Sequence, residues 1–266
     1  MLAVQIYNAI RYKHASSTEV EDTLTTEAML QILVNEEPFT ITMRTPGDEE
    51  ALCRGILFTE NVFTEQNIQP QYTILERDEE NVISRINVSI PIPYLQEGIQ
   101  QKRNLLSVSS CGVCGKYDLD LRLHGILQDE LIMDIPTIPN LFAQMAERQV
   151  QFKESGGCHA AALCTIDGQL LDCKEDIGRH NAVDKTIGSL LRQQRLHEAN
   201  CLLVSGRVSY EIVSKAHRAG IAFLCSVSAP SSMAVEYCKQ SGIALIAFCR
   251  EDRFTVYANA QRMRGV

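Results

Sequence analysis

The sequence predicts an α/β protein in two unequal parts, a small and mainly antiparallel N-terminal α+β domain and a larger domain of alternating strands and helices. In the first part, short runs of strand-forming residues are separated by turn residues, which is typical of hairpins. From residue 201, short apolar runs alternate with helical periodicity, which is typical of right-handed crossovers and a parallel sheet covered on both faces. We expect domains at 1–105 and 119–266, joined by a flexible loop at 106–118.

The N-terminal domain is expected to contain strands around one helix. The expected strands are residues 3–7, 29–34, 39–43 and 82–88. The middle two form a hairpin across the turn residues 35–38. Residues 45–48, Thr-Pro-Gly-Asp, end this hairpin and place a helix N-cap at Gly47 or Asp48. Apolar residues at near-helical spacing follow through residue 62.

The larger domain is expected to begin with a helix and a hairpin before the alternating pattern starts. The expected helices are residues 139–150, 179–195, 209–219 and 231–240. The expected strands are residues 159–166, 169–173, 201–204, 221–227 and 243–248, with 254–257 as an added edge strand. Asp167-Gly168 between two apolar runs is a strong hairpin signal.

Composition narrows the classes of function. A hydrophobic fraction of 45% with 22% charged residues is ordinary for a soluble globular protein. The net charge of −8, without a long block of like charges, argues against nucleic-acid binding, although a local basic pocket can still hold a phosphate. No apolar run is long enough to cross a membrane, and the N-terminus lacks the pattern of a secretory signal. We therefore expect a cytoplasmic protein with reduced thiols.

One short stretch, residues 109–116, stands out from the other cysteines. Cys111 and Cys114 are three positions apart, flanked by glycines, in a segment with little apolar bulk. This spacing suits a dithiol/disulfide couple, half of a metal site, or a nucleophilic thiolate with a second thiol beside it. Lys116 follows directly and favours a thiolate. The cysteines in apolar periodic segments are expected to be packing residues instead; they are Cys53, Cys201, Cys225 and Cys238.

The metal and redox alternatives for this stretch find little support elsewhere in the chain. A zinc deaminase needs His-x-Glu, but His180 is followed by Asn181 and Ala182. There is no second Cys-x-x-Cys or regularly spaced His pair for a structural zinc, so no structural metal is expected. Cys111 does not open a helix after a first strand, as a thioredoxin-like enzyme requires.

Polar loops follow the predicted strands of the larger domain, where ligands bind in open α/β sheets. These loops are residues 175–181, 205–209, 226–232 and 248–253. Helix N-termini and arginines such as Arg179 and Arg207 are suited to phosphate oxygens. For any single loop, helix caps and surface charges are the favoured explanation, and only the convergence of several loops on one edge favours a ligand site. His180 suits a general acid/base, a phosphate ligand or a structural residue. None of the loops carries a nucleotide fingerprint.

Taken together, the ordered motifs resemble the formate dehydrogenase accessory sulfurtransferases, the FdhD/NarQ family, from about residue 28 to the C-terminus. The motifs that carry the resemblance are residues 111–115, 157–162, 175–185, 209–211, 227–229 and 248–257. Members of that family take sulfur from a cysteine desulfurase and pass it to a molybdenum (or tungsten) bis-molybdopterin guanine dinucleotide cofactor, which then serves formate dehydrogenase. Cytoplasmic homodimers and a larger domain similar to cytidine deaminases, with three α/β/α layers, are also implied.

The resemblance also implies roles for particular residues. Cys111 corresponds to the persulfide-bearing cysteine and Cys114 to its supporting thiol. The family's cofactor-binding segment corresponds to Phe248, Cys249, Arg250, Glu251, Asp252 and Arg253. Two acidic residues lie in the middle of that segment, so Arg250 and Arg253 are the expected phosphate or guanine contacts, with Arg179, His180 and Arg207 as further candidates. A second hypothesis remains, that of a cofactor-binding chaperone for formate dehydrogenase whose thiols are not catalytic.

Overall fold

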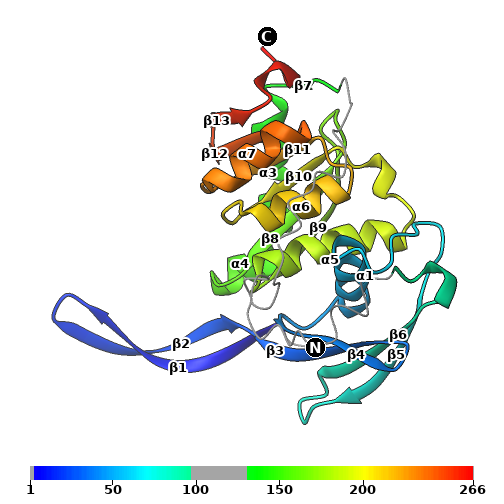
Figure 1. Ribbon diagram of the computed structural model, residues 1–266. Coiled ribbons are helices and arrows are strands. Elements are labelled where there is room, and N and C mark those ends of the chain that lie inside the picture. The colour runs from blue at the N-terminus through cyan, green and yellow to red at the C-terminus, as the bar shows by residue number, and fades with distance from the viewer. Residues whose placement is uncertain (1–2, 97–130, 266) are drawn as a thin grey trace.

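The computed structural model describes residues 3–96 and 131–265 (Figure 1). The expected loop at 106–118, with Cys111 and Cys114, lies outside the described residues. A four-stranded sheet precedes that gap in the description and a six-stranded sheet follows it. The division into domains at 1–105 and 119–266 stays a prediction.

The chain begins with a long two-stranded hairpin that projects from the body of the protein (Figure 1). Strand β1 (Val4–Lys13) pairs antiparallel with β2 (Ser16–Thr25). The sequence predicts only a short strand here, because nearly all side chains of this hairpin are exposed and no alternating apolar face identifies the second strand.

The four-stranded sheet has the order β4-β3-β6-β5. Its strands are β3 (Ala28–Val34), β4 (Glu37–Arg44), β5 (Gln71–Arg77) and β6 (Ile83–Ser89). The β3–β4 hairpin is confirmed, and its turn places Asn35 and Glu36 at positive φ, as a two-residue hairpin turn requires. The sheet is mixed because β3 and β6 pair in parallel. The sequence pattern does not predict β5. A single 3₁₀ turn, η1 (Ile92–Tyr94), follows β6.

Helix α1 (Glu49–Thr59) lies on this sheet and packs against α5 (Arg179–Arg192), far along the chain. The two helices touch through their backbones. A Cβ at Gly55 would lie 1.9 Å from the carbonyl oxygen of Asp184, and one at Gly188 would lie 1.9 Å from that of Ala51. Only glycine permits this approach, which ties the N-terminal elements to the larger sheet.

The six-stranded sheet has the order β13-β12-β11-β10-β8-β9. Its strands are β8 (His159–Cys164), β9 (Leu170–Asp176), β10 (Cys201–Val204), β11 (Phe223–Ser226), β12 (Ala244–Arg250) and β13 (Arg253–Ala258). The predicted parallel arrangement of β10, β11 and β12 is confirmed, as is the β8–β9 hairpin at Asp167-Gly168. The sheet is mixed because β8, β9 and β13 run antiparallel to their neighbours.

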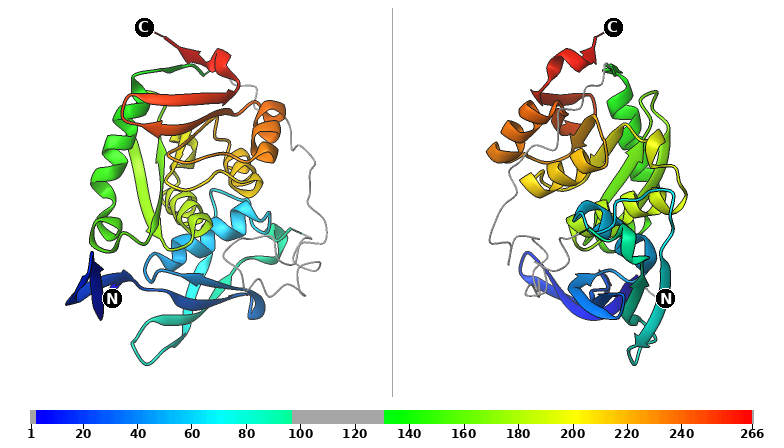
Figure 2. Two further views of the ribbon diagram at one scale, coloured as in Figure 1. Left: turned by 90° about the vertical axis from the view of Figure 1, so that its left-hand side faces the viewer. Right: turned by 45° about the vertical axis from the view of Figure 1, so that its right-hand side comes forward.

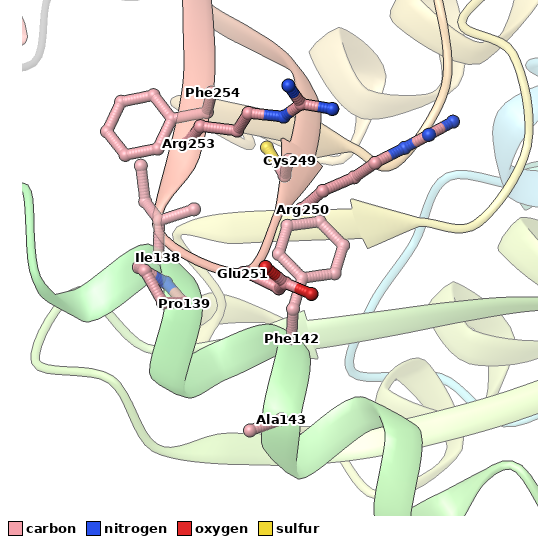
Figure 3. Close-up of a pocket in the computed structure, with 9 residues that line it drawn as sticks. All are labelled: Ile138, Pro139, Phe142, Ala143, Cys249, Arg250, Glu251, Arg253 and Phe254. Atoms are coloured by element: carbon pink, nitrogen blue, oxygen red, sulfur yellow. The ribbon is translucent and has the colours of Figure 1, made fainter.

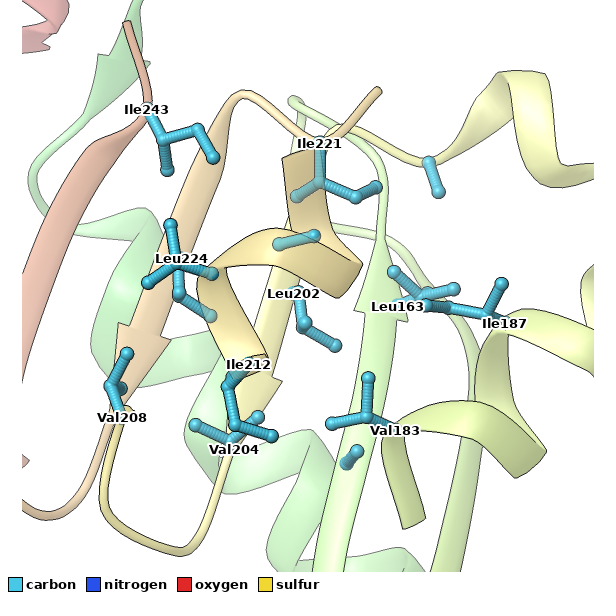
Figure 4. Close-up of a cluster of buried hydrophobic side chains, with 14 of the residues drawn as sticks. Leu163, Val183, Ile187, Leu202, Val204, Val208, Ile212, Ile221, Leu224 and Ile243 are labelled. Atoms are coloured by element: carbon cyan, nitrogen blue, oxygen red, sulfur yellow. The ribbon is translucent and has the colours of Figure 1, made fainter. Parts of the chain in front are cut away.

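Helices cover both faces of this sheet (Figure 2). On one face lie α5, α6 (Tyr210–Arg218) and α7 (Ser232–Ser241), and on the other lies α3 (Thr137–Arg148). Alternate residues of β10 point to the two cores, Leu202 and Val204 towards the first (Figure 4), Cys201 and Leu203 towards the second. The fold is thus a mixed α/β fold, and the relation to cytidine deaminases stays a prediction.

Short elements complete the chain. Helix α4 (Val150–Ser155) follows α3 and ends at Gly156 in the left-handed region. Near the C-terminus, η3 (Ala260–Arg262) leads to β14 (Met263–Arg264), which pairs with β7 (Met133–Asp134). The 3₁₀ turn η2 (Leu196–Glu198) precedes β10. Within the described ranges, no helix has both the length and the apolar character needed to span a bilayer.

Candidate functional site

The loops that follow β10, β11 and β12 are hydrogen-bonded side by side at one edge of the sheet. Ser226 Oγ donates to the Gly206 carbonyl at 2.8 Å, joining the first loop to the second. The Phe248 N–H donates to the Ser228 carbonyl at 3.3 Å, joining the second to the third. The carboxyl ends of three parallel strands therefore present one continuous polar edge, where open α/β sheets bind ligands.

The turn between β9 and α5 is fixed by one buried carboxylate. Asp176 Oδ1 accepts from the Gly178 N–H at 2.8 Å and from Asn181 Nδ2 at 3.0 Å. Its other oxygen accepts from the Thr45 N–H at 3.1 Å and contacts Lys185 Nζ at 2.8 Å. This network sets where α5 begins, and therefore where the side chains of its first turn start.

His159, Arg179 and Arg207 gather around the glycine that follows β10. A Cβ at Gly206 would lie 3.2 Å from His159 Nδ1 and 3.4 Å from the Arg179 Cβ, so this position favours a glycine. His159 Nδ1 lies 3.4 Å from Ser205 Oγ. Arg179 Nε is buried and has no hydrogen-bond partner among the residues that the structure describes.

The imidazole of His159 is held neutral by its surroundings. Partial burial lowers the pKa of His159 from its ordinary 6.5, and the nearby guanidinium groups of Arg179 and Arg207 lower it further against the opposing effect of Asp176. The sequence places His159 only within the motif at residues 157–162. His159 reaches the edge because β8 lies next to β10 in the sheet.

His180 is buried at 7% exposure, with Nε2 3.4 Å from Ser209 Oγ of the neighbouring loop. It therefore lies close to the same edge as Arg179 and Arg207. Cys158 has a different role. Its thiol donates to Glu175 Oε1 at 3.3 Å, and that carboxylate also accepts from the Gln151 and Phe152 N–H groups at the start of α4. This arrangement is typical of a structural contact.

The segment 248–253 forms a bulged turn between β12 and β13. The strand register shifts between Ala247 and Arg250, and Phe248 lies in the left-handed region at a φ of 55°. A bulky residue in that region is uncommon, and bulges of this kind redirect side chains at the rims of sheets. Phe248 is partly exposed, with its ring 6.3 Å from that of Tyr257.

Arg250 and Arg253 are direct partners across this turn. Residues paired in this way lie on the same face, and their guanidinium groups project in the same direction in Figure 3. Neither forms an ion pair with a carboxylate in residues 3–96 or 131–265. Two like charges directly opposite each other are unfavourable without an anion, which makes this pair the strongest phosphate-binding candidate in the segment.

A cavity of about 260 Å³ separates this turn from α3 (Figure 3). It is lined by Ile138, Pro139, Phe142, Ala143, Cys249, Arg250, Glu251, Arg253 and Phe254. Cys249 is 5% exposed, and burial raises its pKa well above the ordinary value of 9.0. Its neutral thiol therefore contributes apolar surface to the cavity. Asp252 is exposed and does not line the cavity. The six predicted residues of the segment therefore occupy different environments.

Among the described residues, no group of three His, Cys, Asp or Glu side chains is arranged to hold a metal ion. The predicted catalytic pair, Cys111 and Cys114, lies outside the described residues. The remaining predicted residues fall into two groups on one edge. Arg179, His180 and Arg207 lie at the loops after β9 and β10, and the other six form the β12–β13 turn.

The chain is similar to known proteins over most of its length. The model of the FdhD/NarQ family matches residues 25–264. A protein from Streptomyces coelicolor named "Sulfur carrier protein FdhD" is 40% identical over 265 residues, covering 96% of this chain and 93% of its own. A protein of the same name from Picrophilus torridus is 38% identical over 253 residues, covering 92% and 93%.

The fold also matches a solved structure. A crystal structure from Desulfotalea psychrophila, described as a formate dehydrogenase accessory protein, superposes with a TM-score of 0.77 at 20% sequence identity. The match covers 99% of this chain and 100% of that one. At this level of identity the comparison establishes the fold.

Proposed function

The chain belongs to the FdhD/NarQ family, and we propose that it is a sulfurtransferase that carries sulfur as a persulfide on Cys111. The donor is a cysteine desulfurase, and the acceptor is the molybdenum (or tungsten) bis-molybdopterin guanine dinucleotide cofactor that serves formate dehydrogenase. Relatives named as sulfur carrier proteins, and a similar fold described as a formate dehydrogenase accessory protein, support this role. The protein acts in the cytoplasm as a homodimer.

The observation that carries the proposal is that the other thiols are buried and most have raised pKa values. The chain has ten cysteines, and the eight in the described residues are buried or half-buried. Burial raises the pKa of Cys158, Cys173 and Cys238 to about 12, which leaves almost no thiolate at neutral pH. Burial likewise raises the pKa of Cys53, Cys164 and Cys249, and contact with Cys225 together with burial raises that of Cys201. Cys111 and Cys114 are the best remaining candidates for a nucleophile.

The proposed chemistry balances in two steps. The Cys111 thiolate attacks the outer sulfur of the desulfurase persulfide, forming a persulfide on Cys111 and releasing the desulfurase cysteine as a thiolate. The Cys114 thiolate then attacks the inner sulfur of that persulfide, forming a Cys111–Cys114 disulfide and releasing hydrosulfide to the acceptor metal. The dithiol is oxidised and the sulfane sulfur is reduced, so a thiol reductant must restore the pair after each transfer.

The acceptor is a large anion, and the edge of the sheet suits it. Arg250 and Arg253 supply two guanidinium groups that have no ion-pair partner in residues 3–96 or 131–265. Arg179 and Arg207 supply two more guanidinium groups beside a neutral imidazole. Guanidinium groups bind phosphate oxygens with two parallel hydrogen bonds. These residues therefore support binding of the phosphates of a dinucleotide substrate.

Mass spectrometry after incubation with a cysteine desulfurase and cysteine tests the sulfur step. We expect an adduct with the mass of one sulfur atom on Cys111, absent in Cys111→Ala. Cys114→Ala should keep the adduct but lose transfer. Cys173→Ala is the matched control because its thiol has a raised pKa and takes no part in the proposed steps.

Formate dehydrogenase activity in cells that carry the same variants gives the second readout. Loss of activity in Cys111→Ala, with activity kept in Cys173→Ala, is the expected pattern. If Cys111→Ala still transfers sulfur, the assignment is wrong. If both thiol variants stay active while Arg253→Ala is inactive, the protein is instead a cofactor-binding chaperone.

A further inference from the structure

The N-terminal hairpin presents one strand edge and several apolar side chains to solvent. We propose that this hairpin, the arm formed by residues 4–25, binds the same arm of a second copy of the chain through antiparallel pairing of the two β1 strands. The inference rests on the proposed function in one respect, because a homodimer is part of that function. It adds the surface that forms the dimer and the register in which the strands pair.

The arm receives little support from its own protein. It projects from the body in Figure 1, and none of its residues is buried. At its base, Thr25 Oγ1 lies 2.6 Å from Ser155 Oγ of α4. An isolated two-stranded hairpin is at best marginally stable in water. An arm with two ten-residue strands therefore gains stability from any chain that pairs with it.

The outer edge of β1 is available for strand pairing. Among residues 3–96 and 131–265, β2 is the only strand that pairs with β1. The Thr26 N–H donates to the Ala3 carbonyl at 2.9 Å and continues the strand register, so odd-numbered residues of β1 direct their backbone groups towards β2. The even-numbered residues therefore present their N–H and C=O groups outwards. An exposed edge of this length is a template for pairing with another chain.

The apolar residues of β1 favour a second copy of this chain as the partner. Ile6, Ile10 and Tyr12 are 69%, 60% and 75% exposed, and they lie on one face of the strand together with Val4. A two-fold axis at Asn8 pairs Ile6 with the partner subunit's Ile10, and Val4 with the partner subunit's Tyr12. Asn8 then meets its own copy, and two amides can hydrogen-bond to each other. The neighbouring registers would instead place Asn8 opposite an isoleucine.

Charge complementarity supports the same register. The tip of β1 carries Arg11, whereas the base of β1 lies beside the exposed acidic turn at residues 78–80. Gln5 Nε2 donates to Glu80 Oε2 of that turn at 3.0 Å. In the register centred on Asn8, Arg11 of one copy lies directly opposite Gln5 of the other and on the same face. Its guanidinium group is therefore placed near the partner subunit's Glu80, and symmetry repeats this contact.

The edge of β2 does not suit the same pairing. Near its middle β2 carries Glu19, Glu21 and Asp22, so pairing of two β2 strands about a two-fold axis would bring like charges together. Within its own chain, Arg11 lies 3.8 Å from Asp22, and both side chains are more than half exposed. An exposed pair at this distance is weak, so it competes little with a contact to a second copy.

Analytical ultracentrifugation of the full-length protein tests the inference, and we expect a dimer. Asn8→Pro removes an outward N–H at the axis and none of the bonds to β2, so it should raise the dissociation constant of the dimer at least about 100-fold. Glu21→Pro is the matched control, because Glu21 pairs with Asn8 and lies on the opposite edge of the same hairpin. This control should leave the dimer intact.

An exchange of charges tests the register without a change in the backbone. Arg11→Glu and Glu80→Arg should each weaken the dimer about tenfold, because each places like charges opposite each other at two symmetric positions. The double variant restores opposite charges and should recover most of the affinity. A role of either residue in the stability of its own chain alone would not produce this recovery.

A monomeric wild-type protein, a dimer that Asn8→Pro leaves unchanged, or equal weakening by Glu21→Pro would each overturn the inference. A double variant that binds no more tightly than the single variants would do the same. The Cys111 adduct is measured on the same samples. An adduct on a protein whose dimer does not respond to the arm variants overturns this inference alone, whereas an arm-dependent dimer without an adduct overturns the sulfur-transfer proposal alone.

Discussion

Lys185 Nζ lies 2.8 Å from Asp176 Oδ2, and both side chains are almost completely buried, at 1% and 0% exposure. The same ammonium group donates to the Thr45 carbonyl at 2.8 Å, and the same carboxylate accepts from the Thr45 N–H. This pair therefore joins the strand that ends before α1 to the helix that starts beside the candidate site. A second buried pair, Lys215 with Asp184 at 2.8 Å, joins α6 to α5 and α1 through Thr59.

Removing the charge at Lys185 should destabilise the fold strongly. In Lys185→Met the Asp176 carboxylate loses its buried partner, so the free energy of unfolding should fall by about 3–5 kcal/mol. Chemical denaturation at neutral pH measures this. Lys174→Met is the control, because Lys174 pairs with Asp48 at a partly exposed position and its loss should cost less than about 1 kcal/mol. Equal effects of the two variants would contradict the role given to the buried pair.

Because α1 and α5 touch at glycines, replacing these glycines by alanine should destabilise the protein, which is the reverse of the usual effect in a helix. Glycine to alanine normally stabilises a helix interior by about 1 kcal/mol. At Gly188 the new methyl group would lie 1.9 Å from the Ala51 carbonyl oxygen, so Gly188→Ala should destabilise the protein by about 1–3 kcal/mol or more. Gly55→Ala should behave in the same way from the other side of the contact. A rise in melting temperature for either variant would show that the helices lie further apart.

The arginine pair predicts opposite effects on stability and on binding. Arg253→Ala removes the like charge that is paired with Arg250 across the two strands, so the ligand-free protein should gain about 0.2–1 kcal/mol. The same variant should bind GDP more weakly because one phosphate donor is lost. Thermal unfolding with and without GDP separates the two effects. Arg264→Ala removes an arginine that is paired with Asp134 and should show no gain.

His159 should titrate below its ordinary pKa of 6.5. The folded state disfavours the charged imidazole, so the stability that neutral His159 contributes is present above pH 6.5 and is lost as the pH falls through the lowered pKa. NMR titration of the His159 ring measures the midpoint. Arg207→Ala should raise it and Arg207→Lys should not, because the positive charge beside the ring causes part of the shift. An unchanged midpoint in Arg207→Ala would show that Arg207 does not affect the pKa of His159.

Thiol reactivity should divide the cysteines sharply. In the native protein at mildly alkaline pH, iodoacetamide should modify Cys111 and Cys114 well before Cys158 or Cys173, whose pKa burial raises to about 12. Peptide mapping by mass spectrometry gives the order, and denatured protein provides the reference in which all thiols react. Early modification of Cys158 would show that its contact with Glu175 opens readily.

Periodic segments of the larger domain could be predicted from sequence because their apolar spacing follows the geometry of a helix or a strand directly. The strand at Cys201–Val204 matches its prediction residue for residue, and the helix that begins at Tyr210 is preceded by Ser209 as its cap. The β1–β2 hairpin and β5 lacked this signal because their side chains are mostly exposed on both faces. Local patterns record burial, so exposed strands escape them.

The candidate site likewise has some features that local sequence patterns predict and others that they do not. The Cys111–Cys114 spacing, the family motifs and the loops that follow the parallel strands can be identified from the sequence alone, because each is a short local pattern. Other features depend on how the chain folds: His159 lies beside Arg179, Arg250 and Arg253 face the same way, and Glu251 lines a cavity while Asp252 does not. These relationships depend on which strands are neighbours and on a bulge that shifts the strand register. Contacts between distant segments, rather than local periodicity, fix both.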